Sequence, residues 1–338
     1  MKRSIVCYLW IVACAGTFMG CDSGHIARKN VSGRPGDVVV VIPKETWDGA
    51  TGAAVRAVLQ RPQVGLPQDE PLFSLISIPP IAFKDIFKTN RNILQVRISP
   101  TTDTARVEFK RDVWAWPQAV VNILAKSQSE FIELFQANSE KIVSFLLKAE
   151  RERLQMAYSQ SPDKVITGIV KEKFGIGIDI PVGFKVALDT GNFLWVRYDT
   201  PKITQNVMIY SYPYVSDSTF TERFMLDKRD SVVKVAHGAY DDSYMVTERR
   251  IPACFSLLKY HDCYASELRT LWRMDGHPGY HLGGPFVSLS ILDPAEPRII
   301  TVEGSVVAAG EDKRNYMRQL EAIAYSLRFH NSQSVAHE

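Results

Sequence analysis

Two apolar runs near the C-terminus set the fold class, FVSLSIL at 286–292 and RIITVEGSVV at 298–307. Both have the composition of strands, and the short connection between them predicts a hairpin. Asp312 is then expected to cap a last helix, whose apolar face comprises Tyr316, Leu320, Ile323 and Leu327. A run of strands closed by a helix favours antiparallel sheets with helices packed on one face. This is an α+β fold and not a doubly wound parallel sheet.

The same order of elements is expected along the rest of the chain. Strands are predicted at 38–42, 72–78, 92–98, 105–110, 119–125, 245–249, 251–258 and 264–272. Helices are predicted at 46–60, 83–87, 128–156, 162–175 and 220–236. The helix at 128–156 has the clearest signal, because Ser127 and Glu130 form a capping box before an apolar stripe.

Segments of the second half resemble the first half in the same order. The run from Asn92 to Arg97 matches Asn192 to Arg197 at four of six positions, and Phe131 aligns with Phe220. This predicts two related α/β units, at 37–158 and 159–330, that arose by duplication. Superposition of the units should then place Asn92 on Asn192. The alternative is that such short matches arose by chance.

The N-terminus has the pattern of a secretory leader. Lys2 and Arg3 precede an uncharged apolar stretch at 5–18, which is too short for a permanent bilayer span. Residues 1–20 therefore form a predicted signal peptide. The box at 18–21 ends in Gly20-Cys21, which predicts lipidation of Cys21 and a membrane partner held through that lipid. Plain secretion or an uncleaved anchor is the alternative. A polar linker is expected at 21–36 and a short tail at 331–338.

Composition argues for an ordinary globular body after the leader. The chain has 338 residues, of which 46% are hydrophobic and 23% charged. Removal of two leader basic residues from 40 leaves 38 against 37 acidic ones, a formal +1. This balance gives no support to nucleic-acid binding. We find no GxSxG or Gly-rich phosphate motif, so we expect no cofactor and do not favour an enzyme.

Two cysteines remain in the body of the protein, Cys254 and Cys263. The predicted hairpin turns near Tyr260 and His261, which places Cys254 opposite about Glu267. Each residue along a strand adds about 3.3 Å, so the two cysteines exceed the roughly 7 Å limit between Cα atoms for a disulfide. We therefore expect two free thiols, with a disulfide as the alternative.

Alternating aromatic residues indicate a binding surface. Tyr210, Tyr212 and Tyr214 share one face of a predicted strand, Met208 extends that face, and Trp195 is placed on the neighbouring strand. An exposed ridge of this kind would bind a peptide, a glycan or an envelope protein. The alternative is that the rings fill the core. Pro213 within the run suggests an edge strand, which could also accept a partner strand.

The pair His277 and His281 is a weak candidate for metal binding. A zinc site needs three or four ligands, and the intervening Pro278 and Gly279 exclude a regular helix that would align the two rings. A solvated loop is the alternative interpretation, and no bound metal is expected.

Four segments show a resemblance to a known family. They are PKETWDG at 43–49, YSYPY at 210–214, GGPFVS at 283–288 and DKRNY at 312–316. With these segments the chain resembles an uncharacterised lipoprotein family of the Bacteroidota, whose domain has no known function. The resemblance extends over nearly all of the chain after the leader. It implies a location in the cell envelope and offers no activity. Because no acidic run follows Cys21, it also implies a protein that faces the periplasm.

Three functions remain open from the sequence. The leading hypothesis is a membrane-tethered protein that binds an envelope component without catalysis. The alternative is an envelope hydrolase or a metal-dependent enzyme without a recognisable motif, and the third is a structural role. A deep pocket with convergent His, Asp, Ser or Cys side chains would favour the enzyme. A shallow aromatic surface would favour the binding protein.

Overall fold

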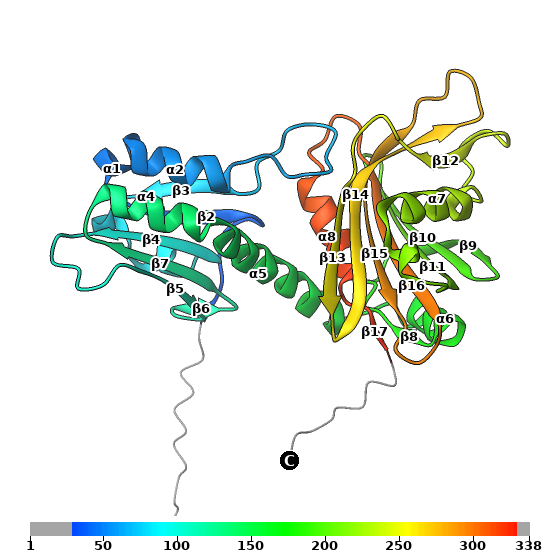
Figure 1. Ribbon diagram of the computed structural model, residues 1–338, viewed down its shortest axis with the longest axis horizontal. Helices are drawn as coiled ribbons and strands as arrows, with labels where there is room; N and C mark the ends of the chain where they lie inside the picture. Colours follow the sequence, from blue (N-terminus) through cyan, green and yellow to red (C-terminus); the bar gives the residue numbers. More distant parts are fainter. Residues whose placement is uncertain (1–28, 330–338) are drawn as a thin grey trace, which may run out of the picture.

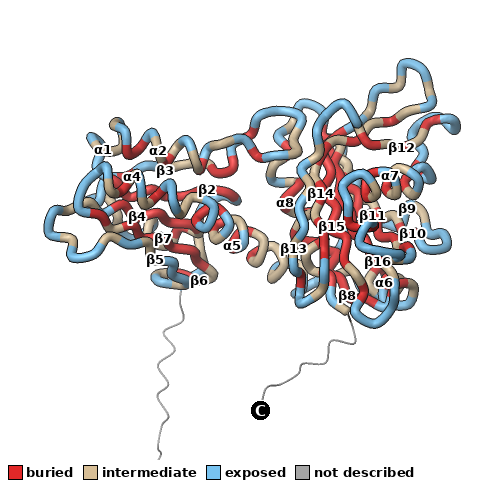
Figure 2. Tube along the Cα trace, in the orientation of Figure 1, coloured by how far each residue is buried: buried red, intermediate tan, exposed pale blue. Residues whose placement is uncertain are grey.

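The computed structural model describes residues 29–329, which form two α/β units joined by the long helix α5 (Ser139–Gln160) (Figure 1). The predicted signal peptide, Cys21 and the tail lie outside the described residues. Figure 2 shows that the central strands of both units are buried while most of the connecting loops are exposed. Across residues 29–329, no helix is both long and apolar enough to cross a bilayer.

The N-terminal unit is built on a five-stranded sheet with the order β3-β2-β4-β7-β5. Its strands are β2 (Asp37–Val41), β3 (Ser74–Ile78), β4 (Asn92–Ile98), β5 (Arg106–Arg111) and β7 (Ala119–Ala125). A separate two-stranded pair joins β1 (Lys29–Asn30) to β6 (Ala115–Trp116). The predicted strands thus exist with bounds shifted by a few residues.

The prediction of antiparallel pairing is wrong for this N-terminal sheet. Strand β2 pairs in parallel with β3 and β4, β4 pairs in parallel with β7, and only β5 pairs antiparallel. The physical reason lies in the run from Val38 to Val41, whose four valines are at most 5% exposed. A strand that is apolar on both faces is typical of the centre of a parallel sheet.

Helices α2 (Ala50–Leu59), α4 (Gln128–Ala137) and α5 cover one face of this sheet. Ser127 caps α4 as predicted, since its hydroxyl accepts from the Glu130 amide at 3.3 Å. The single helix predicted at 128–156 is interrupted at Asn138. The helix predicted at 46–60 is likewise divided at Gly49, into α1 (Lys44–Asp48) and α2. The opposite face is covered by the short helices η1 (Pro80–Ala82) and α3 (Asp85–Lys88).

The C-terminal unit confirms the antiparallel prediction with an eight-stranded sheet. Its order is β12-β14-β15-β16-β11-β10-β9, and β13 also pairs with β14. The strands are β9 (Lys185–Thr190), β10 (Phe193–Asp199), β11 (Thr204–Pro213), β12 (Tyr244–Thr247), β13 (Cys254–Tyr260), β14 (Cys263–Asp275), β15 (Gly283–Leu292) and β16 (Arg298–Val307). The predicted hairpin of β15 and β16 is present, with Phe286 opposite Ser305. The short pair β8 (Ile176–Gly177) and β17 (Arg328–Phe329) lies beside this sheet. The α+β fold class is therefore confirmed.

Helices lie on both faces of this C-terminal sheet, which corrects the prediction of one face. Helices α6 (Lys164–Phe174) and α8 (Arg314–Ala324) pack on one side, whereas η2 (Asp217–Phe220) and α7 (Glu222–Val233) pack on the other. Alternate residues of the central strands are buried toward each side. Ile209 contributes to the first core and Tyr210 to the second. Both faces therefore require a cover.

The predicted duplication is wrong, because the two units differ in sheet topology. Asn92 begins β4, and both strands beside β4 run parallel to it. Asn192 lies in the turn before β10, and both strands beside β10 run antiparallel to it. Phe131 lies within α4, but Phe220 belongs to the short helix η2. The aligned residues therefore occupy different elements, and the short sequence matches are coincidental.

Two helix starts also differ from the sequence prediction. Asp163, and not the first turn at Pro162, caps α6 by accepting from the amides of Val165 and Ile166 at 3.0 Å. The start of α8 is held by Glu70 of the N-terminal unit and not by Asp312. The two carboxylate oxygens of Glu70 accept from the backbone amides of residues 313 and 314 at 2.6 and 2.8 Å. This contact joins the two units, because the first amides of a helix need acceptors from outside it.

The two cysteines of the hairpin are free, as predicted. The turn lies at His261 and Asp262, so Cys254 pairs with Arg269 and not with Glu267. Cys263 pairs instead with Tyr260. The register differs from the predicted one by two residues and keeps both thiols on separate parts of the hairpin.

Candidate functional site

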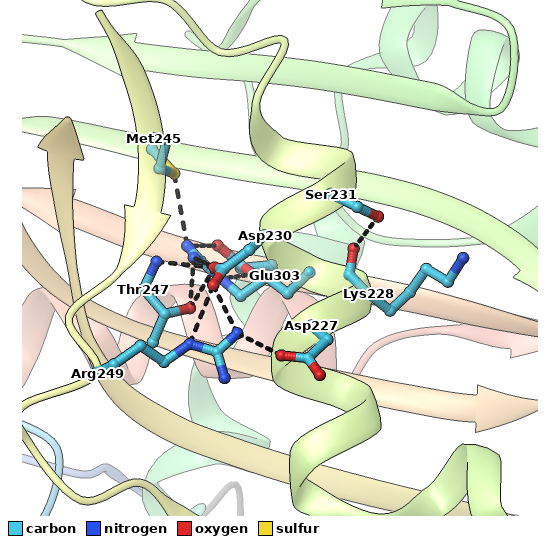
Figure 3. A network of polar contacts seen from close by, with 9 residues as sticks. Asp227, Lys228, Asp230, Ser231, Met245, Thr247, Arg249 and Glu303 are labelled. Atoms are coloured by element: carbon cyan, nitrogen blue, oxygen red, sulfur yellow. Dashed lines mark hydrogen bonds and ion pairs between the residues drawn. The ribbon is translucent and has the colours of Figure 1, made fainter. Parts of the chain in front are cut away.

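The face of the C-terminal sheet under α7 contains a buried ion pair (Figure 3). Arg229 of α7 donates from Nε and Nη2 to the two carboxylate oxygens of Glu303 on β16, at 2.8 and 2.7 Å. The two side chains are 1% and 0% exposed. Burial raises the pKa of Glu303, and the charge of Arg229 opposes that change. Because both oxygens accept from the guanidinium, the pair is ionised and bidentate.

Asp230 extends this network to β12. Its Oδ1 accepts from the amide and the hydroxyl of Thr247 at 2.8 and 2.6 Å, and Oδ2 accepts from Arg249 Nη2 at 2.6 Å. Burial tends to raise the pKa of Asp230, but these hydrogen bonds lower it below its ordinary value. Every partner in the network is a protein group. The network therefore fixes α7 and β12 on the sheet. Met245 of β12 lines the adjacent pocket, so the network also holds that part of the lining in place.

The pocket lies beside this network, at the end of the sheet where β10, β11, β14 and β16 meet the loop after α7. Its volume is about 400 Å³, which is at the small end of the range for ligand sites. Its walls are mainly aromatic and apolar. The lining residues are Trp195, Arg197, Thr204, Asn206, Ala236, His237, Gly238, Ala239, Met245, Trp272, Met274, Tyr280, Leu282 and Val307.

The loop between α7 and β12 packs against the loop between β14 and β15 beside the pocket. The ring of Tyr240 stacks on His277 with centroids 3.7 Å apart, and it meets Tyr280 edge-on at 5.2 Å. The Nδ1 atom of His277 lies 2.9 Å from Asp242 Oδ1. Gly238 permits this closure, since a Cβ there would lie 2.5 Å from Tyr280 Cε1. The wall is thus held by ring contacts across two loops.

Two buried N–H donors of the lining have no hydrogen-bond partner among the described residues, Trp272 Nε1 and Arg197 Nε. Trp272 is only 3% exposed, so its unpaired N–H has a real energetic cost. Gly284 lies against this nitrogen and the backbone of β16, because a Cβ at 284 would lie 3.5 Å from Nε1 and only 2.0 Å from the carbonyl oxygen of Val306. In contrast, Trp195 Nε1 donates to Asn206 Oδ1 at 3.0 Å. The unpaired nitrogen atoms of Trp272 and Arg197 are both covered by other protein atoms, so the pocket presents its aromatic and apolar side chains, and not these two donors, to a ligand.

The lining has little net charge. Arg197 donates from Nη2 to Asp199 Oδ1 at 2.8 Å, and its guanidinium lies 5.5 Å from the Trp195 ring centroid. The charges of Arg197 and Lys185 and a hydrogen bond from Thr204 lower the pKa of Asp199, against the raising effect of burial. The ionised carboxylate therefore balances the arginine. Among the lining residues there is one histidine and no Asp, Glu, Ser or Cys.

The predicted aromatic ridge is largely part of the core. Tyr210 and Tyr212 are 3% and 6% exposed, and burial raises the pKa of Tyr212 to about 12. Tyr214 is half-buried and donates to Asp217 Oδ1 at 2.7 Å. Strand β11 lies between β10 and β16, so Pro213 does not mark an edge. Of the predicted surface only Trp195 lines the pocket, and it pairs with Met208 on the neighbouring strand as predicted.

The two candidate metal ligands are not brought into one site. His277 stacks on Tyr240 and contacts Asp242, whereas His281 lies in a different hollow with Glu248 and Arg273. Residues 29–329 contain no group of three or more His, Cys, Asp or Glu side chains that could hold a metal ion.

Sequence reasoning missed Trp272, Arg197 and Tyr280. A signal was available for Arg197, because it follows Trp195 by two residues and thus shares its face of β10. Trp272 and Tyr280 lie more than 70 residues further along the chain. No local pattern indicates that these residues approach Trp195, since only the closing of the sheet brings them together.

Comparison with known proteins gives two family matches and no function. Residues 31–159 match a domain of unknown function (DUF8532), and residues 163–326 match a second domain of unknown function (DUF4837). No curated protein matches the chain.

Two solved structures show a distant likeness. A protein of Bacteroides thetaiotaomicron is 11% identical with a TM-score of 0.26, and the match covers 47% of this chain and 46% of that one. The chain thus spans less than half the length of that protein. A point mutant of protein Mog1 is 7% identical with a TM-score of 0.31, over 47% of this chain and 92% of that one. Likeness at this level carries no argument about function.

Proposed function

We propose that the protein is a cell-envelope lipoprotein, anchored through Cys21 and facing the periplasm, that binds a neutral glycan in the pocket between Trp195 and Trp272. The leader and the Gly20-Cys21 box support the anchor. The absence of an acidic run after Cys21 supports the orientation. The body would then act near one membrane, where the tether raises the effective concentration of its ligand.

The observation that carries the ligand class is the aromatic lining of the pocket, to which Trp195, Trp272 and Tyr280 contribute. A sugar has apolar faces that stack on indole rings and a rim of oxygen atoms that accept from N–H groups. The balanced charge of Arg197 and Asp199 favours a neutral ligand over an anionic one. A volume of about 400 Å³ suits a small ligand or one end of a longer chain.

The lining does not favour the alternative of an envelope hydrolase. Hydrolysis by a protein side chain needs a nucleophile or an acid–base pair within hydrogen-bonding distance. His237 is the one imidazole among the residues that line the pocket, and its Nδ1 lies 2.9 Å from the backbone oxygen of Ser243. No carboxylate, serine or cysteine of the lining is available as its partner.

Titration calorimetry with neutral trisaccharides, including an N-acetylglucosamine trimer, tests this proposal. We expect saturable binding, and Trp195→Ala should weaken it about fivefold, since it removes a stacking surface that contributes about 1 kcal/mol. Trp116→Ala, in the other unit, is the matched control and should bind as the wild type does. Heat-silent titrations with every trisaccharide, or equal binding by Trp195→Ala, would overturn the assignment.

A further inference from the structure

Four exposed apolar side chains gather on the N-terminal unit, and we call them the tether face. They are Ile81, Ile86, Val113 and Trp116, with exposures of 79%, 71%, 39% and 44%. They come from η1, from α3, from the segment between β5 and β6, and from β6 itself. Exposed apolar residues are normal when they occur singly. The gathering of four on one part of the molecule requires an explanation.

A small core holds these segments together on the sheet face away from the helices. Phe83 and Trp114 meet edge-on, with ring centroids 5.2 Å apart. Phe83, Phe87 and Trp114 pack on a buried layer of the sheet that includes Val39 and Ile93. The apolar side chains of the tether face therefore project from two segments that contact each other. Their position is fixed by the core beneath them.

The chain enters the fold at this same place. Strand β1 begins at Lys29 and pairs in parallel with β6, which Figure 1 shows at the lower end of the N-terminal unit. The next residues lie between β6 and the end of α3. The amide of Val31 donates to Trp116 O at 3.0 Å, and the amide of Ser32 donates to Thr89 O at 2.8 Å.

The distance from the proposed anchor to this entry point is short. Eight residue steps separate Cys21 from Lys29, and no chain of that length can span more than about 28 Å. A lipid on Cys21 would therefore hold Lys29, and the tether face beside it, within that distance of the bilayer.

The charges around the tether face match an anionic membrane. Lys29 and Lys84 are exposed, Lys88 is half-buried, and Asp85 and Asp112 are the acidic residues of the same segments. Three lysines against two aspartates leave a positive balance, which attracts acidic headgroups. Trp116 adds an indole ring, a group enriched where apolar and aqueous phases meet.

We propose that the tether face docks on the bilayer that carries the anchor, with its apolar side chains inserted among the lipid headgroups. This inference rests on the proposed lipid anchor at Cys21. Docking would fix the orientation of the protein, so that the C-terminal unit and its pocket are presented in a defined direction. A lipid anchor alone would leave the body free to rotate about its tether.

The test uses the full-length protein, processed in cells and reconstituted in vesicles of phosphatidylethanolamine and phosphatidylglycerol. Cys254 and Cys263 are replaced by serine, and the environment-sensitive dye NBD is attached at Ile86→Cys. The matched control is Val165→Cys in α6, because Val165 is 72% exposed and Ile86 is 71% exposed. We expect the emission of the dye at position 86 to shift to shorter wavelength on vesicles. Nitroxide lipids should also quench it there, with neither change at position 165.

Flotation of the same samples separates the two proposals. Flotation of the wild type, lost in Cys21→Ala, supports the anchor. If the protein floats while the dye at position 86 behaves like that at 165, docking is refuted and the anchor stands. If the wild type does not float, the proposed anchor fails. If the wild type does not float and the emission of the dye at position 86 does not shift, docking is refuted as well. If it does not float but that emission shifts, the result supports docking without an anchor.

Discussion

The buried pair of Arg229 and Glu303 permits a quantitative prediction. Glu303→Gln removes the charge that receives two hydrogen bonds from Arg229, at 2.7 and 2.8 Å, and leaves the buried guanidinium only the longer contact of its Nη1 with Asp230 Oδ1, at 3.5 Å. A hydrogen bond to a charged group contributes about 1.5–3 kcal/mol, and breaking one partner of a buried pair costs about 3–5 kcal/mol. We therefore expect the free energy of unfolding, measured in urea by tryptophan fluorescence, to fall by about 3–5 kcal/mol.

The matched control is a pair of similar length at the surface. Lys44 Nζ lies 2.6 Å from Asp48 Oδ2, with the two side chains 78% and 57% exposed. Asp48→Asn should cost about 0.5 kcal/mol or less, because solvent screens exposed pairs. The double variant Arg229→Met/Glu303→Leu should unfold within about 1 kcal/mol of the wild type, since it removes both charges together. A cost for Glu303→Gln no larger than that for Asp48→Asn would show that α7 is not docked through a buried ion pair.

Two further predictions concern acid stability and the thiols. The charges of Arg153 and Arg91 outweigh burial and hold the pKa of Glu150 below its ordinary value of 4.5, so its contribution is complete above that pH and is lost as the pH falls through the folded pKa. Stability measured by urea unfolding from about pH 6 to pH 3 should therefore fall less steeply in Glu150→Gln, and an unchanged slope would contradict this. Mass spectrometry of non-reduced digests should find Cys254 and Cys263 in unlinked peptides, whereas a linked peptide would exclude the register described above.

The C-terminal sheet was the part of the fold most open to prediction. The strand predicted at 298–307 has those bounds in the structure, and its partner at 286–292 starts only three residues earlier than expected. These strands are long, apolar and separated by a short turn, so local sequence specifies both their existence and their antiparallel pairing.

The N-terminal sheet shows where that reasoning failed. The run from Val38 to Val41 is apolar at every position, and the predicted helix at 46–60 follows it. A continuous apolar run followed by a helix is the signature of a parallel β-α-β crossover. The hairpin order of the second half does not extend to this run, because helices α1 and α2 connect β2 to the parallel strand β3.

By itself, the sequence determined the α+β class, most strands and helices and the two free thiols, and the predicted leader on which the anchor hypothesis depends is also an inference from sequence. Tertiary structure alone decided which side chains meet. Glu70 caps α8 from the other unit, and Trp195 shares a pocket with Trp272. The physical reason is range: periodicity and capping act within a few residues, whereas these contacts depend on how complete sheets and helices pack. The same packing buried Tyr210 and left Ile86 in solvent.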